Sequence, residues 1–125
     1  MSFIERLQAG RFAVALEITP PQKPLPGVLL RRAGLLGEAA HAVNVIQRPG
    51  RQPSLDASIA LRESGLHPVW HLVTRGAERD DIRAALQRAH ASGVRQLLAI
   101  RGDHAGADLP GTPTLRDAIA MAAEE

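Results

Sequence analysis

The chain has 125 residues, enough for one domain spanning 1–125, and 45% are hydrophobic, as is typical of a globular protein. It contains no cysteine, which excludes disulfides and thiolate metal sites and favours a cytoplasmic location. A formal net charge of +2 and 2% aromatic residues argue against a nucleic-acid partner, and no apolar run approaches the roughly 20 residues of a membrane span.

The N-terminal half of the sequence predicts a short helix, a strand and a second helix. Residues 1–10 predict a short helix that ends at Gly10, not a secretory signal. Residues 12–18 alternate large apolar side chains with small or polar ones, which predicts a strand. After a proline-rich loop, a helix is expected from Val28, with apolar residues at helical spacing as far as Ala40.

The rest of the sequence continues the alternation. Strands are expected at 42–47, 68–74 and 95–101, and helices are expected to begin with Ser54 as N-cap, near Asp80 and near Thr114. The strand ends recur about every 29 residues, close to the roughly 31 residues that each unit of an eight-stranded (β/α) barrel uses. The prediction is therefore an α/β fold, a half barrel of four βα units with parallel strands and outer helices.

The first strand favours a barrel over an open sheet. In an open doubly wound sheet both faces meet helices, so both should carry large apolar side chains. Here the large residues share one face, whereas Ala13, Ala15 and Glu17 share the other. A narrow barrel interior accommodates small residues with one polar residue at its mouth.

The carboxyl ends of the strands supply the candidate site residues, because the active sites of parallel barrels lie there. A carboxylate in an apolar strand, as at Glu17, must be solvated, paired, or kept protonated by burial, and the last state would make it a general acid. Asp103 follows Gly102 at the rim, either as a turn cap or as a site residue. His71 is either a hydrogen-bonded core histidine or a site residue. Asn44, Gln47 and Thr74 lie at strand ends as well.

The arginine-containing loop after the second strand, with Arg48 and Arg51, either contacts a phosphate or is simply solvated. A metal loop could be drawn from Asp103, His104 and Asp108, but no second cluster supports it, so no metal is expected.

Several segments together resemble the N-terminal half of the methylenetetrahydrofolate reductase family. They are "ALEITPP" at 15–21, "AVNVIQ" at 42–47 and the run from "HPVWHLVT" to "LAIRGDHAG" at 67–106. The resemblance implies a flavoprotein (β/α)₈ barrel that uses FAD to reduce 5,10-methylenetetrahydrofolate to 5-methyltetrahydrofolate, a step of one-carbon metabolism that serves methionine biosynthesis. A nicotinamide or another donor would supply the electrons.

The same resemblance implies roles for individual residues. Glu17 occupies the position of the general acid that opens the five-membered ring of the folate to the reactive iminium. Asp103 matches the aspartate beside the flavin, where its charge favours that cation. His71, Thr74 and Gly102 match positions of the cofactor site. Ile46 departs from the family, because a threonine that bonds the cofactor is common there.

Two functions follow from these observations. The first is a reductase-type flavoprotein segment, expected to form a homo-oligomer or to meet a complementing half-barrel, since an open half barrel exposes two strand edges and an apolar inner face. The second is a non-catalytic half barrel that acts as a binding or scaffold module. A flavin absorption band would distinguish them.

Overall fold

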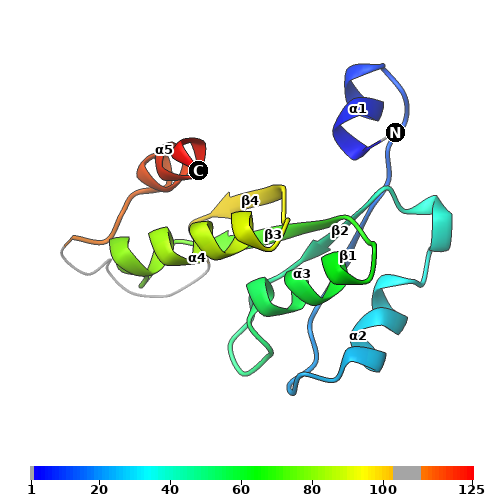
Figure 1. Ribbon diagram of the computed structural model, residues 1–125, viewed down its shortest axis with the longest axis horizontal. Coiled ribbons are helices and arrows are strands. Elements are labelled where there is room, and N and C mark those ends of the chain that lie inside the picture. Colours follow the sequence, from blue (N-terminus) through cyan, green and yellow to red (C-terminus); the bar gives the residue numbers. More distant parts are fainter. Residues whose placement is uncertain (1, 103–110) are drawn as a thin grey trace.

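The computed structural model describes residues 2–102 and 111–125, and strands alternate with helices after a short N-terminal helix (Figure 1). The strands are β1 (Ala15–Ile18), β2 (Ala42–Val45), β3 (Pro68–Val73) and β4 (Gln96–Ile100). The helices are α1 (Phe3–Gln8), α2 (Pro26–Ala33), α3 (Ser54–Glu63), α4 (Arg79–Ala91) and α5 (Leu115–Glu124), with a 3₁₀ turn, η1, at Gly37–Ala39. In the described ranges no helix is long and apolar enough to cross a membrane.

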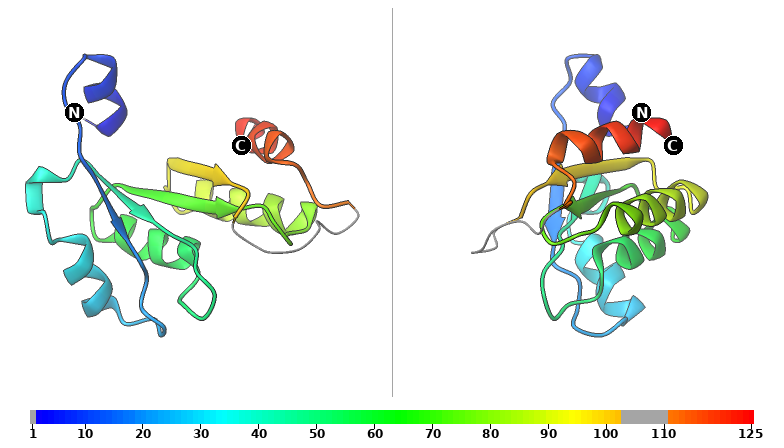
Figure 2. Two further views of the ribbon diagram at one scale, coloured as in Figure 1. Left: turned by 180° about the vertical axis from the view of Figure 1, so that it is seen from behind. Right: turned by 90° about the vertical axis from the view of Figure 1, so that its left-hand side faces the viewer.

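The four strands form one sheet in the order β1-β2-β3-β4, and each neighbouring pair is parallel. Strands that are consecutive in the chain are therefore neighbours in the sheet, with helical segments between them. Figures 1 and 2 show α2, α3 and α4 along one side of this sheet, with α5 beside β4. The predicted class, four βα units of a (β/α) barrel with outer helices, is confirmed.

The strand register divides the sheet side chains between two faces, because successive residues of a strand point to opposite sides. The helix face carries Leu16, Ile18, Val43, Val45, Trp70, Leu72, Leu97 and Ala99. The open face carries Ala15, Glu17, Ala42, Asn44, Val69, His71, Val73, Gln96, Leu98 and Ile100. The sequence predicted that the first strand has large apolar side chains on one face and small or polar ones on the other. This prediction is confirmed for the residues that pair with β2.

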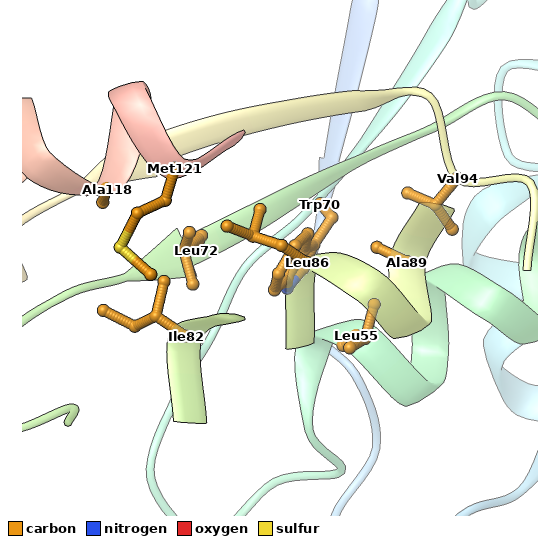
Figure 3. Close-up of a cluster of buried hydrophobic side chains, with 9 residues drawn as sticks. All are labelled: Leu55, Trp70, Leu72, Ile82, Leu86, Ala89, Val94, Ala118 and Met121. Carbon is orange, nitrogen blue, oxygen red and sulfur yellow. The ribbon is translucent and has the colours of Figure 1, made fainter. Parts of the chain in front are cut away.

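Two buried apolar clusters lie on the helix face. One joins β3 to α3, α4 and α5, and Figure 3 shows its members, which are Leu55, Trp70, Leu72, Ile82, Leu86, Ala89, Val94, Ala118 and Met121. The other joins β1 and β2 to α2 and α3, and its members are Ile18, Leu29, Ala33, Val43, Val45, Ala57 and Leu61. Among the described residues, neither cluster includes a side chain of the open face. Burial of apolar surface by the helices therefore stabilises one side of the sheet.

The first strand is shorter than the predicted 12–18. Phe12 precedes it with a side chain that is 85% exposed, and its carbonyl oxygen accepts hydrogen bonds from the Arg6 guanidinium. The regular ladder starts where Ala15 meets Ala42, the first residue of β2. The extent of the neighbouring strand thus sets the start of β1, although the alternating pattern begins earlier.

The expected helix from Val28 to Ala40 is also shorter than predicted. It starts at Pro26, which suits a first turn because proline has no amide hydrogen to leave unpaired, and it ends at Ala33. Gly34 is its C-cap, and Gly37 has a φ of +51°. Glycine disfavours a helix interior, so the chain leaves the helix here despite the continuing apolar pattern.

The N-terminal helix α1 begins with a capping box between Ser2 and Glu5 and ends before Gly10. Figure 1 shows it apart from the sheet and the other helices. Its apolar residues Ile4 and Leu7 are 47% and 51% exposed, and no residue of the helix is buried. The expected apolar side is therefore present but contributes no fully buried residue in the described chain.

Candidate active site

A cavity lies at the carboxyl ends of the strands, on the open face. Its volume is about 670 Å³, within the range of small-molecule sites. It is lined by Glu17, Ile46, Gln47, Arg48, Pro49, His71, Val73, Arg75, Ile100 and Gly102. All four strands or the residues that follow them contribute, as expected when parallel strands end at one edge.

Glu17 is on β1, in register with Asn44 of β2. Its side chain is exposed at the mouth of the cavity. Of the three states expected for this carboxylate, the structure shows the solvated one, because none of residues 2–102 and 111–125 buries the Glu17 side chain.

His71 is on β3, and its side chain is only 5% exposed although it lines the cavity. Its ring Nε2 lies 3.0 Å from Oδ1 of Asn44. Burial lowers the pKa of His71 below the ordinary value of 6.5, and the negative charge of Glu17 opposes this shift. His71 is thus a buried, hydrogen-bonded histidine that also lines the cavity, and its role as a site residue stays a prediction.

The backbone around His71 is held by the start of α3. Ser54 is 2% exposed, and its hydroxyl donates to the carbonyl oxygen of His71 at 3.0 Å. The Ser54 amide donates in turn to Oε1 of Gln47 at 2.9 Å. The prediction of Ser54 as N-cap was wrong by one position, because Pro53 is the N-cap and Ser54 the first helical residue. The Ser54 hydroxyl makes no capping hydrogen bond to α3 and instead bonds the backbone of β3.

Thr74 follows β3 and points away from the cavity that Glu17 and His71 share. Its side chain is 2% exposed and borders a separate pocket of about 290 Å³, next to Pro113 and Thr114. Its amide donates to the carbonyl oxygen of Ile100 at 2.9 Å, which continues the β3–β4 ladder by one residue. The structure therefore does not bring Thr74 together with Glu17 and His71.

Gly102 lines the cavity directly after β4. Its φ is +96°, a conformation that favours glycine, and a Cβ atom at this position would lie 2.7 Å from Cγ1 of Val73. Both observations require a residue without a side chain. The role of Gly102 in a cofactor site stays a prediction, and the close approach that the structure shows is to the neighbouring strand.

The remaining predicted site residues fall outside the described ranges. Asp103, predicted to be catalytic and cofactor-binding, lies there, as do His104 and Asp108 of the metal loop that was considered. Within residues 2–102 and 111–125, no three histidine, aspartate or glutamate side chains form a group that could hold a metal ion.

Arginine side chains border the cavity on the side of β1 and β2. Arg48 lines the cavity and also an adjoining groove of about 380 Å³, which is lined in addition by Glu17, Arg32 and Arg51. Arg32 donates to the carbonyl oxygen of Thr19 at 2.8 Å. Arg48 is exposed and Arg51 is half-buried. The positive charges give this rim the potential to attract anionic groups, so phosphate contact stays a prediction for this loop.

The sequence interpretation missed the hydrogen bond between Asn44 and His71. The position of Asn44 at a strand end had been noted, but no role was attached to it. The available signal was the alternation of the strands, which places Asn44 and His71 on the same face of their strands.

Comparison with known proteins gives one family. The family model described as "Methylenetetrahydrofolate reductase" matches residues 2–121 of the chain. No curated protein matches the sequence.

Proposed function

Because the chain belongs to the methylenetetrahydrofolate reductase family, we propose that its cavity takes part in the FAD-dependent reduction of 5,10-methylenetetrahydrofolate to 5-methyltetrahydrofolate. The observation that carries this proposal is the joint presence of Glu17, His71 and Gly102 around one cavity at the strand ends. The first supplies an acid–base group, the second a buried hydrogen-bonding ring, and the third a backbone without a side chain.

The residues fit a flat, partly polar cofactor. Val73 and Ile100 provide apolar walls, and His71 provides a polar group that is held in place. Gly102 leaves the wall after β4 free of a side chain. His71 and Gly102 would therefore hold FAD, with Thr74 supporting them by extending the β3–β4 ladder. When bound, FAD would accept electrons from a nicotinamide or another donor and deliver a hydride to the folate.

Two carboxylates would act on the folate. Glu17 would donate a proton to the folate nitrogen that leaves the one-carbon unit when the five-membered ring opens. Asp103 would stabilise the resulting iminium cation by its negative charge. Glu17 is solvated in the open half barrel, so a bound folate, or a covering partner, is needed to exclude water from it.

A partner for the open face belongs to the same proposal. β1 and β4 each have one unpaired edge in the described sheet, and Leu98 on the open face is 45% exposed. Unpaired edges and exposed apolar side chains favour association. We therefore propose that a second copy or a complementing half-barrel covers this face in the active assembly.

A non-catalytic binding module is the second candidate, and Ile46 favours it. Ile46 lines the cavity and cannot donate a hydrogen bond to a cofactor, unlike the threonine common at that position in the family. If the site no longer holds FAD, the retained scaffold would serve binding alone.

FAD titration of the purified protein tests these alternatives. We expect quenching of flavin fluorescence that saturates, together with a protein-bound flavin absorption band. Gly102→Val, which places a branched side chain against Val73, should abolish both signals, whereas Gly76→Val, at a glycine with nothing within 4 Å of an added Cβ, should leave them. A wild-type protein that stays colourless and cannot be reconstituted would support the binding module.

The role of Glu17 is tested by Glu17→Gln in the assembly that reduces the folate. Loss of a general acid lowers rates by roughly 10²–10⁴-fold, and FAD binding should be retained. Glu38→Gln, which removes an exposed carboxylate in η1, is the matched control and should not alter the rate. An unchanged rate in Glu17→Gln would show that the acid is another group.

A further inference from the structure

The pair formed by Asn44 and His71 is the most specific side-chain contact on the open face. Asn44 is half-buried on β2, His71 is buried on β3, and Oδ1 and Nε2 are 3.0 Å apart. Asn44 is in register with Val69, so His71 is its diagonal neighbour two residues further along β3. Side chains two residues apart along a strand point to the same face of the sheet, so Asn44 and His71 share the open face.

The chemistry of the two groups fixes the position of a proton. An amide oxygen only accepts hydrogen bonds, so Nε2 of His71 must carry the hydrogen. Burial lowers the pKa of the ring, which therefore carries a single hydrogen near neutral pH. A neutral imidazole has one donor nitrogen and one acceptor nitrogen, so Nδ1 is the acceptor.

We propose that Asn44 is a positioning residue that holds His71 in the Nε2–H tautomer and thereby presents Nδ1 as the acceptor for an N–H or O–H group of a ligand in the cavity. The assignment of the tautomer stands on the Asn44–His71 contact and the burial of the ring, and not on the proposed function. The ligand part rests on the proposed function, since it requires that the cavity bind FAD or a related donor-bearing molecule.

The surroundings restrict the effect of Asn44 to the ring. The His71 backbone is held independently, by the Ser54 hydroxyl on its carbonyl oxygen and by the pairing of β3 with both neighbouring strands. Removing the Asn44 amide therefore removes the partner of Nε2 without removing a contact of the His71 backbone. Tautomer selection by the partner of the second ring nitrogen is a general property of histidine.

NMR of the ¹⁵N-labelled protein without flavin reads out the tautomer directly. The nitrogen chemical shifts and the couplings to the ring protons distinguish Nε2–H from Nδ1–H, and His71→Gln identifies the signals of this residue among the five histidines. We expect Nε2–H in the wild type at neutral pH. A spectrum that shows Nδ1–H would overturn the proposal.

Variants at Asn44 test whether this residue selects the tautomer. Asn44→Asp keeps an acceptor oxygen, but its negative charge raises the pKa of His71, so it should retain Nε2–H with a neutral ring only when measured at a pH above that raised pKa. Asn44→Ala removes the acceptor and should give a mixture of tautomers. Gln96→Ala is the matched control, because Gln96 is an amide residue on the same face without a hydrogen bond to His71 among the described contacts. An unchanged tautomer in Asn44→Ala would contradict the proposal.

Flavin affinity tests the ligand part. Asn44→Ala should weaken FAD binding by about tenfold, the effect of one hydrogen bond of roughly 1.4 kcal/mol. Asn44→Asp should restore much of it at a pH where the ring is neutral, and less of it at lower pH, where Nδ1 also carries a hydrogen. Equal FAD affinity in the wild type and Asn44→Ala would refute the presentation of Nδ1 to the ligand. A wild type with Nε2–H that binds no FAD would refute the proposed function instead, and would leave the role of Asn44 toward the ring supported.

Discussion

On the helix face of the sheet, strand side chains such as Trp70 and Leu72 pack into apolar clusters that α3, α4 and α5 complete. On the open face, the alternating positions carry Glu17, Asn44 and His71 beside small or partly exposed apolar residues. The same four strands therefore serve two purposes. Helices stabilise one face by excluding water, and the other face places polar and ionisable groups around the cavity.

Two leucines on neighbouring strands give the strongest test of this contrast. Leu72 on the helix face is 6% exposed and Leu98 on the open face is 45% exposed. Leu72→Ala should lower the free energy of unfolding by about 2–5 kcal/mol, because it leaves a cavity in the core. Leu98→Ala should change it by no more than about 0.5 kcal/mol.

Urea unfolding followed by the fluorescence of Trp70, the single tryptophan, measures both variants. Similar losses in the two variants would mean that Leu98 is buried in the protein in solution. Both faces of the sheet would then be covered in solution. In that case Leu98→Ala should also weaken self-association, measured by light scattering.

Gly102 gives a smaller effect, at the point where the open face meets the cavity rim. Gly102→Ala should lower the free energy of unfolding by about 1–3 kcal/mol, because it combines a positive φ with a close contact to Val73. Gly76→Ala is the matched control, since Gly76 has a φ of +74° but nothing within 4 Å of an added Cβ. The control should lose about 1–2 kcal/mol, the effect of the positive φ alone, and so less than Gly102→Ala. Equal losses of unfolding free energy in Gly102→Ala and Gly76→Ala, measured by thermal or urea unfolding, would show that the backbone at Gly102 does not lie close to Val73.

Much of this arrangement could be predicted from the sequence. The alternation of the first strand placed Leu16 and Ile18 opposite Glu17, and the regular spacing of strand ends predicted parallel βα units. Element limits were harder, because they depend on neighbours. Ala15 begins β1 where β2 offers a partner, and Gly34 ends α2 although the apolar spacing continues.

The site could be predicted only in part. Glu17 and His71 were found because ionisable residues in apolar strands require an explanation. The bond between Asn44 and His71 depends on the register of two strands, which their separate patterns do not fix. Thr74 shows that position along a strand is not enough, because it is three residues from His71 and so has the opposite orientation.

The pH dependence of stability tests the burial of His71. Its pKa is lowered in the folded protein, so the unfolded chain binds more protons once the pH falls below about 6.5, the ordinary value. The neutral ring of His71 contributes fully to the free energy of unfolding above that pH. This contribution is lost as the pH falls from about 6.5 through the folded-state pKa of His71. We expect the free energy of unfolding to decrease on acidification over this window.

Comparison with His71→Gln isolates this contribution from those of the other histidines. The difference in unfolding free energy between wild type and variant should shift in favour of the variant as the pH falls. A difference that does not change with pH would show that His71 is as accessible to protons in the folded protein as in the unfolded chain.

The smallest expected effects compare two helices with the same capping chemistry. Ser2 and Thr114 each accept a hydrogen bond from the third helical amide, at 3.2 Å and 3.1 Å. α5 packs Ala118 and Met121 into the core, whereas α1 buries no residue. Thr114→Ala should therefore lower the free energy of global unfolding by about 1 kcal/mol. Ser2→Ala should leave it unchanged, because fraying of α1 exposes nothing that the fold depends on.

Trp70 fluorescence reports global unfolding in both variants, because Trp70 belongs to the same cluster as the α5 residues. Thr114→Ser, which keeps the capping hydroxyl, is the control and should match the wild type. Amide hydrogen exchange at Glu5 should accelerate in Ser2→Ala even though the global transition is unmoved. A loss of global stability in Ser2→Ala would show that α1 packs against the rest of the protein, and the apolar Ile4 and Leu7 would then be the contacts to test next.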